Sequence, residues 1–268
     1  MFGCMAALII ALAASVPGFG GPGAGSAYAA GTQQTYIKYT VQKGDSLYKI
    51  SRAYGTTVNV LKTANNLSSD LIYTGSVLNV PVLSKDALVQ SKALKDILAA
   101  RGLTASQLQI NLVVDKSDKL LTVYTGNNPL KAYRIELGEG GTGDKQVAGD
   151  HKTPDGSFYI AQKSILSPAD EYLGTRWMRL SYPNIEDAQR GLSSGLIDKT
   201  TYNAIVNAIN NGQIPPQNTA LGGGIGIHGG SVPAFGTNWT WGCVGLTNKD
   251  VQDFYDYTKV GTKVTIRQ

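Results

Sequence analysis

The sequence contains very few of the residues that bind transition metals. Its 268 residues include two cysteines, Cys4 and Cys243, and two histidines, His151 and His228. A structural zinc site needs four such ligands, usually closely spaced pairs of Cys or His. We therefore expect no metal and no cofactor.

The sequence also lacks an apolar run of the roughly 20 residues that a membrane span requires. The apolar run from Met5 to Val16 is shorter, and Ala27-Tyr28-Ala29 follows with the small-x-small form of a signal-peptide cleavage site. These features predict a signal peptide at 1–29, no integral span after its removal, and export to the periplasm or cell wall. No Lys or Arg precedes the apolar run, and the alternative is a disordered apolar tail.

Removal of the signal peptide would take Cys4 with it, and Cys243 would remain as a single thiol that cannot form an internal disulfide. A lone thiol in an oxidising compartment is exposed to damage. Such a cysteine is usually either buried and inert or retained for chemistry.

The chain lacks dense basic segments with interleaved aromatic residues, so we expect no nucleic-acid partner. Its formal net charge of +5 favours weaker attraction to polyanions such as anionic lipid or cell-wall polymer. The 32 glycines favour many turns and a β-rich body. The length suits one sizeable core and a small additional module.

The segment from Tyr39 to Pro81 has the pattern of a very small α+β domain. Tyr39-Thr40-Val41 and 77–81 are strand-like. Between them, apolar residues recur at helical spacing over 47–54 and again over 58–64. We predict the order β-α-α-β for this segment, preceded by a linker at 30–38.

The same segment resembles the LysM module in its motifs Tyr39 to Leu47, Asn65-Asn66-Leu67 and Leu78 to Pro81. The resemblance implies binding of N-acetylglucosamine-containing glycan strands of peptidoglycan. Its ligand loops correspond to Gly44, Asp45, Ser46, Leu47, Leu71 and Ile72. The alternative is a structural helix-turn unit.

Beyond this module, Ser84 to Arg101 has a helical pattern and predicts a helical linker at 82–107. Residues 108–268 then predict a mainly β domain with inserted helices. The expected strands are 110–114, 119–124, 133–137, 157–161, 225–227 and 263–267, and the expected helices are 185–211, broken near 191–195, and 251–257.

His228 and Cys243 lie fifteen positions apart in this domain, each beside glycine. A free thiol has a pKa of about 8.5, so little of it is nucleophilic thiolate at neutral pH. A neighbouring imidazole can remove the thiol proton and later return a proton to a departing amine. Gly242 leaves backbone room for a substrate carbonyl, and main-chain N–H groups beside Cys243 could stabilise an oxyanion.

These residues resemble the YkuD-type L,D-transpeptidase catalytic domain, through His228-Gly229, Thr240-Trp241-Gly242-Cys243 and Thr153-Pro154-Asp155-Gly156. The resemblance implies a β-sandwich and acyl transfer on tetrapeptide stems through a thioester at Cys243, the type of cysteine that carbapenems label. It also implies that the Gly229 carbonyl orients His228. The residues expected to contact substrate are Thr240, Trp241, Gly230, His151 and Thr153.

Two residues depart from the family pattern. Trp241 stands where the family often has His, and Gly245 stands where it commonly has Arg or Asn. Because that Arg or Asn helps to hold substrate, two alternatives to transfer stay open. One is a cysteine hydrolase that cleaves peptide crosslinks or attachments, and the other is a non-catalytic wall-binding protein.

Overall fold

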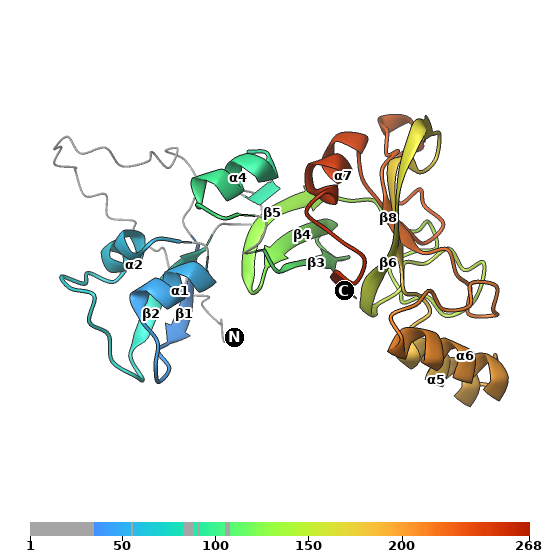
Figure 1. Ribbon diagram of the computed structural model, residues 1–268, viewed down its shortest axis with the longest axis horizontal. Coiled ribbons are helices and arrows are strands. Elements are labelled where there is room, and N and C mark those ends of the chain that lie inside the picture. The colour runs from blue at the N-terminus through green and yellow to red at the C-terminus, as the bar shows by residue number, and fades with distance from the viewer. Residues whose placement is uncertain (1–34, 55, 83–87, 90–91, 105–107) are drawn as a thin grey trace, which may run out of the picture. The chain divides into compact units, whose positions relative to one another are not determined.

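The computed structural model describes residues 35–54, 56–82, 88–89, 92–104 and 108–268 (Figure 1). The predicted signal peptide at 1–29 lies outside these residues. In the described part, no helix is long and apolar enough to cross a membrane.

The amino-terminal module has the predicted β-α-α-β order. Strands β1 (Thr35–Thr40) and β2 (Val77–Val82) pair antiparallel, and helices α1 (Leu47–Ala53) and α2 (Val58–Ala64) lie between them in sequence. The module has its own small core, formed by Val41, Leu47, Ile50, Leu61, Leu78 and Val80. β1 begins at Thr35, so residues 35–38 belong to this sheet and not to the predicted linker at 30–38.

The linker helix is shorter than its sequence pattern predicts. Helix α4 spans Leu94–Ala100, and the two residues before it, Lys92 and Ala93, are not helical. Residues 88–89, also within the predicted helix at 84–101, are helical, and 84–87 and 90–91 lie outside the described residues. Leu94 and Leu98 are buried in the core of the carboxy-terminal domain. The apolar face of the predicted helix therefore packs the short helix α4 against this domain.

The carboxy-terminal domain is built on an eight-stranded sheet with the strand order β5-β4-β3-β10-β6-β7-β8-β9. The strands are β3 (Ile110–Asp115), β4 (Leu120–Thr125), β5 (Asn128–Arg134), β6 (Gly156–Asp170), β7 (Gly174–Leu180), β8 (Gly226–His228), β9 (Val244–Gly245) and β10 (Lys263–Arg267). Two pairs are parallel, β3 with β10 and β8 with β9, and the others are antiparallel.

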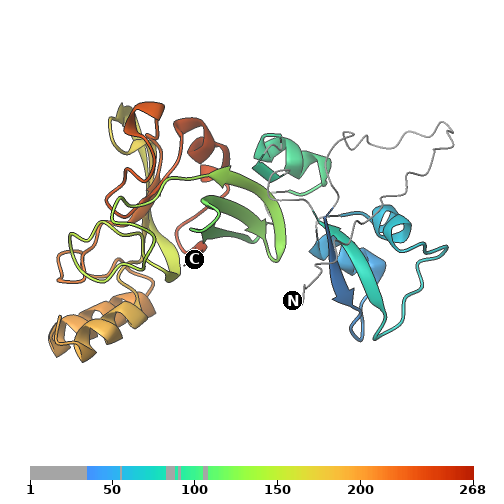
Figure 2. The ribbon, with the colours of Figure 1, turned by 180° about the vertical axis from the view of Figure 1, so that it is seen from behind.

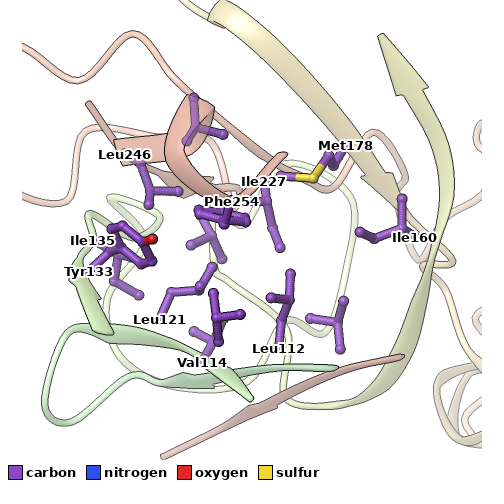
Figure 3. Packing of buried hydrophobic residues seen from close by; sticks show 14 of the residues in the cluster. Leu112, Val114, Leu121, Tyr133, Ile135, Ile160, Met178, Ile227, Leu246 and Phe254 are labelled. Atoms are coloured by element: carbon purple, nitrogen blue, oxygen red, sulfur yellow. The ribbon is translucent and has the colours of Figure 1, made fainter. Parts of the chain in front are cut away.

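Strand β6 joins the two halves of this sheet. Its first residues pair with β10, whereas those from Ile160 onward pair with β7. The inward side chains of both halves meet in one core, and Figure 3 shows Leu112, Leu121 and Tyr133 facing Met178, Ile227 and Phe254 across it. The β-sandwich with inserted helices that the sequence predicts is therefore confirmed.

Two helices form a hairpin with a core of its own. α5 (Ile185–Ser193) and α6 (Lys199–Asn210) lie side by side in Figure 2, with Ala188, Ile197, Ile205 and Leu221 buried between and beneath them. Asn184 and Asp198 cap their first turns through side-chain oxygens. The turn between them includes Gly195 at a φ of 72°, within the break that the sequence predicts.

Several strands differ from their predicted limits. β5 ends at Arg134, where the sequence predicts a strand beginning at Tyr133, and β6 is much longer than the predicted 157–161. β7 and β9 were not predicted. Their residues are mixed in polarity or too few to show alternation, and pairing with distant strands decides their conformation. α7 (Asn248–Tyr255) begins three residues earlier than predicted, because the Thr247 side chain caps it.

Candidate active site

His228 ends strand β8 and is buried. Its Nδ1 lies 2.8 Å from the carbonyl oxygen of Gly229. A carbonyl can only accept, so Nδ1 carries the hydrogen and the neutral ring presents Nε2 as a basic atom. Nε2 is buried and has no hydrogen-bond partner among the described residues.

Burial lowers the pKa of His228 to about 4, although the hydrogen bond to Gly229 and the charge of Asp170 oppose the shift. Three aromatic rings cause this desolvation. Those of Tyr172 and Trp239 have centroids 5.6 Å from that of His228, and the ring of Trp177 lies at 5.8 Å. At neutral pH, His228 is therefore an uncharged base.

Strand pairing places Cys243 next to strand β8, which ends at His228. β8 and β9 are parallel, with Ile227 opposite Val244 and His228 opposite Gly245, so the residue just before β9 lies beside β8. The Cys243 side chain is 7% exposed, and its Sγ lies 3.5 Å from the carbonyl oxygen of Gly224. Burial raises the pKa of the thiol to about 11. The resting pair is thus a neutral thiol and a neutral imidazole.

This resting state predicts slow alkylation of Cys243. With a pKa of about 11, roughly one thiol in ten thousand is ionised at pH 7. We expect the rate of carboxamidomethylation by iodoacetamide, followed by mass spectrometry, to rise about tenfold per pH unit from 7 to 10. The urea-unfolded chain is the control. Its alkylation rate should stop rising once the pH exceeds the ordinary pKa of a free thiol. A flat, fast rate between pH 5 and 8 in the folded protein would instead demonstrate a preformed thiolate.

The loop before Cys243 is fixed by internal contacts. The buried Thr240 hydroxyl donates to the Cys243 carbonyl oxygen at 2.7 Å and accepts from the Gly242 N–H at 3.3 Å. Gly242 has a φ of 116°, and a Cβ there would lie 2.7 Å from the Lys152 carbonyl oxygen. Glycine is needed at this position because the neighbouring loop occupies the space of a side chain.

Two of the residues that the sequence predicts to contact substrate have buried side chains that hold neighbouring loops in place. The Thr240 side chain is buried in the loop just described. Thr153 is also buried, and its hydroxyl accepts from the N–H of Gly138 at 2.9 Å. Both hydroxyls are buried and have main-chain partners, and contact of these residues with substrate stays a prediction. They hold the loops around the site.

Trp241 is exposed and lies against the partly exposed His151. Their rings stack with centroids 5.8 Å apart, and His151 Nδ1 lies 2.6 Å from Glu139 Oε1. His151 has a φ of 50°, which fixes its loop in a left-handed turn. The Trp241 N–H donates to the hydroxyl of Tyr172 at 2.9 Å, so this pair borders the rings around His228.

Two residues that sequence reasoning missed support the histidine. Tyr172, in the turn between β6 and β7, covers the His228 ring. Asn248 Oδ1 accepts from the N–H groups of Thr175 and Gly230, at 2.9 and 3.1 Å. The Gly229–Gly230 peptide is thus held at its N–H while its carbonyl binds His228 Nδ1. No local pattern marks either residue, because each reaches the site from a distant part of the chain.

A side chain at Gly245 would be tightly packed. A Cβ there would lie 3.1 Å from both Thr240 Cγ2 and Trp239 Cζ2. Its main-chain N–H and carbonyl both bond Glu136, at 2.8 Å each. An Arg or Asn at this position would therefore require Trp239 or Thr240 to shift by a few tenths of an ångström.

A pocket of about 720 Å³ has two of the rings around His228, those of Tyr172 and Trp239, in its walls. It is lined by Glu139, Tyr172, Ala234, Phe235, Thr237, Asn238 and Trp239. Tyr172 and Trp239 contact each other, with centroids 4.8 Å apart, and each contacts His228. The pocket is therefore separated from the base by two aromatic rings. Within the described ranges, no group of three His, Cys, Asp or Glu side chains could hold a metal ion.

Some of the residues predicted to bind glycan in the amino-terminal module are buried in its core, and others lie at its surface. The Leu47 side chain is buried in the module's core and Ile72 packs partly against that core, and contact of these residues with glycan stays a prediction. Asp45 Oδ2 accepts from the Tyr39 hydroxyl at 2.6 Å and holds the turn. Ser46 Oγ accepts from the N–H of Lys49 at 3.2 Å. Leu71 is exposed, and Gly44 lies in the turn with a φ of 88°.

Two family models match the chain. One, described as the L,D-transpeptidase catalytic domain (YkuD), matches residues 110–266. The other, described as the LysM domain, matches residues 39–81. Together they cover both folded parts of the chain.

Individual proteins show the same two similarities. The cell wall-binding protein YocH of Bacillus subtilis is 60% identical over 43 residues, 16% of this chain and 15% of YocH. The helical cell shape determining protein Pgp2 of Campylobacter jejuni is 24% identical, with a TM-score of 0.41, over 65% of this chain and 55% of Pgp2. An L,D-transpeptidase of Mycobacterium smegmatis is 14% identical, with a TM-score of 0.35, over 60% of this chain and 59% of that one. The chain thus covers a small part of YocH and little more than half of the two solved structures.

Proposed function

The chain belongs to the family of the YkuD L,D-transpeptidase catalytic domain, and from this premise we propose that it is a cysteine acyltransferase acting on peptidoglycan stem peptides. The observation that carries the proposal is the pairing of β8 with β9. It brings a buried His228 with an unpartnered Nε2 beside the strand that follows Cys243. Catalytic roles for Cys243, His228, Gly229 and Gly242 are part of this proposal.

The reaction has two steps. The Cys243 sulfur attacks the carbonyl carbon of the L-to-D peptide bond in a tetrapeptide stem, while His228 Nε2 takes the thiol proton. The C–N bond breaks, and the terminal D-alanine leaves with that proton. An acceptor amine then attacks the thioester carbon, the C–S bond breaks, and the amine proton returns to sulfur through His228. Main-chain N–H groups beside Cys243 would stabilise both oxyanions.

The amino-terminal module, which matches the LysM domain, would hold the enzyme on glycan strands. YocH, whose name describes cell-wall binding, is similar over 43 residues, as many as the LysM match at 39–81 spans. Tethering raises the local concentration of stem peptides without new active-site contacts. We therefore propose a wall-associated, exported enzyme.

The test is mass spectrometry of purified muropeptides incubated with the mature protein, with and without a free D-amino acid, beside Cys243→Ala. We expect crosslinked or D-amino-acid-exchanged products from the wild-type protein only. Cysteine-dependent shortening without exchange would assign a hydrolase instead, the alternative that Gly245 favours. Unchanged muropeptides in every sample would contradict an enzyme and leave wall binding as the function.

A further inference from the structure

Strand register places Arg179 on the same face of the sheet as Cys243. In the antiparallel pairing of β7 with β8, Arg179 lies opposite Gly226. In the parallel pairing of β8 with β9, Ile227 lies opposite Val244, so the residues just before them, Gly226 and Cys243, lie beside one another. Residues directly opposite one another in a sheet direct their side chains to the same face. Arg179 and Cys243 therefore flank Gly226, which has no side chain.

Hydrogen bonds connect the Arg179 guanidinium to the thiol. Gln217 Oε1 accepts from Arg179 Nη1 at 2.8 Å and from the Gly224 N–H at 2.8 Å. The carbonyl oxygen of Gly224 lies 3.5 Å from Cys243 Sγ. Burial raises the pKa of Cys243, and the positive charge of Arg179 is among the interactions that oppose this shift. The guanidinium is thus near enough to act on a negative charge at the site.

The partners that hold this guanidinium carry no negative charge. Its Nε donates to Gln162 Oε1 at 3.1 Å, and its central carbon lies 5.5 Å from the centroid of the Trp177 ring. Within the described ranges no Asp or Glu pairs with Arg179, whereas Arg190 pairs with Asp187. Arg179 is partly exposed, and its Nη2 makes no hydrogen bond to any described residue. An oriented guanidinium with a free edge is suited to bind a carboxylate.

The substrate of the proposed reaction carries a carboxylate next to the bond that breaks. In a tetrapeptide stem, Cys243 would attack the carbonyl carbon that is joined to the terminal D-alanine. The D-alanine carboxylate is three bonds from that carbon, so it lies within about 4 Å of it. Such an α-carboxyl group has a pKa of about 3.5 and is ionised at neutral pH. Bringing this charge to a buried thiol costs free energy unless a cation pairs with it.

We infer that Arg179 binds the carboxylate of the terminal D-alanine of the donor stem and makes the enzyme select stems that end at this residue. The inference rests on the proposed acyltransferase function. A stem that is amidated at this position, or that continues by a further residue, presents a neutral amide to the guanidinium and binds less tightly. The bound carboxylate leaves with D-alanine when the C–N bond breaks, so Arg179 acts on the acylation step and not on the choice of acceptor.

Binding can be tested apart from catalysis in the Cys243→Ala protein by isothermal titration calorimetry. The probes are a synthetic stem tetrapeptide that ends in a D-alanine carboxylate and the same peptide ending in D-alanine amide. We expect the carboxylate peptide to bind about tenfold more tightly, the size of a hydrogen bond between charged groups at a partly exposed site. Adding Arg179→Gln should remove this difference. The matched control is Arg134→Gln, an exposed arginine at the end of β5, which should preserve it.

Equal binding of both peptides to the Cys243→Ala parent, or a preserved difference in a folded Arg179→Gln protein, would overturn the inference. Thermal unfolding shows whether each variant is folded. Arg179→Lys keeps the charge but loses the planar fork, so its preference should fall to about threefold. If Arg179→Gln does not fold, the Lys variant decides, because an unchanged tenfold preference there would also overturn the inference.

Kinetics separate this inference from the proposed function. In the active enzyme, kcat/KM for the carboxylate tetrapeptide should fall about tenfold in Arg179→Gln, while kcat/KM for the amide peptide should not change. If the wild-type protein transfers acyl groups from both peptides equally well, the inference fails and the proposed function stands. If carboxylate-dependent binding persists while neither peptide reacts, the proposed function fails and Arg179 remains the carboxylate site of a binding protein.

Discussion

Replacing His228 with asparagine is expected to lower the rate of acyl transfer at pH 7 by about three orders of magnitude, the range of a lost general base. Asparagine keeps an amide N–H that can donate to the Gly229 carbonyl, but it has no basic nitrogen. The loss is large because burial raises the pKa of the Cys243 thiol to about 11. Without the imidazole, only the small thiolate fraction can react.

The pH profile separates this explanation from misfolding. In the wild-type protein, activity should fall as the pH drops through about 4, where His228 takes a proton. In His228→Asn, the residual rate should rise about tenfold per pH unit between 7 and 10, as Cys243 ionises without help. Initial rates on a tetrapeptide muropeptide, with thermal unfolding as the folding control, provide the measurement. A loss below tenfold, or a flat profile in a folded variant, would exclude His228 as the base.

Replacing Asp253 with asparagine is expected to destabilise the catalytic domain by about 3 kcal/mol, the range for breaking a buried ion pair. Asp253 Oδ2 lies 2.8 Å from Lys131 Nζ and accepts from the Tyr133 hydroxyl at 2.8 Å. Both its oxygens also lie within 3.2 Å of the Leu94 N–H, where helix α4 begins. The substitution leaves the mostly buried Lys131 ammonium without a counter-charge and weakens the attachment of α4.

Differential scanning calorimetry should show the unfolding temperature of Asp253→Asn lowered by about 10 °C, as expected for a domain of this size. Asp256→Asn is the matched control, since Asp256 is exposed just after α7, and it should change stability by less than about 0.5 kcal/mol. Equal unfolding temperatures for the two variants would contradict a structural role for the Asp253 contacts.

Local sequence patterns predict many of the helices, strands and turns. Apolar residues at helical spacing define α1 and α2, and alternating residues around the Asp115 turn define the β3–β4 hairpin. Asn184 and Asp198 are typical capping residues, and Gly195 is a typical turn residue. Such signals depend on the nearest few residues, so they can be predicted without the fold. The pair His228 and Cys243 was found the same way, through motifs that are continuous in sequence.

The rest depends on segments that are distant in the chain. Tyr172 covers His228 from the β6–β7 turn, and Asn248 holds the Gly229–Gly230 peptide from α7. The burial of Thr153 and Thr240 also comes from packing between loops. Sequence spacing carries no information on these contacts, because any of many exposed polar or aromatic residues could have supplied them.

The sequence by itself determined the two modules, the order of most elements, and the residues that we propose as nucleophile and base. Only the tertiary structure decided their charge states, the aromatic rings around His228 and the tight packing at Gly245. The physical reason is that a pKa and a free volume are set by desolvation and packing. Both are properties of surfaces that meet only when distant strands pair, as β8 and β9 do here.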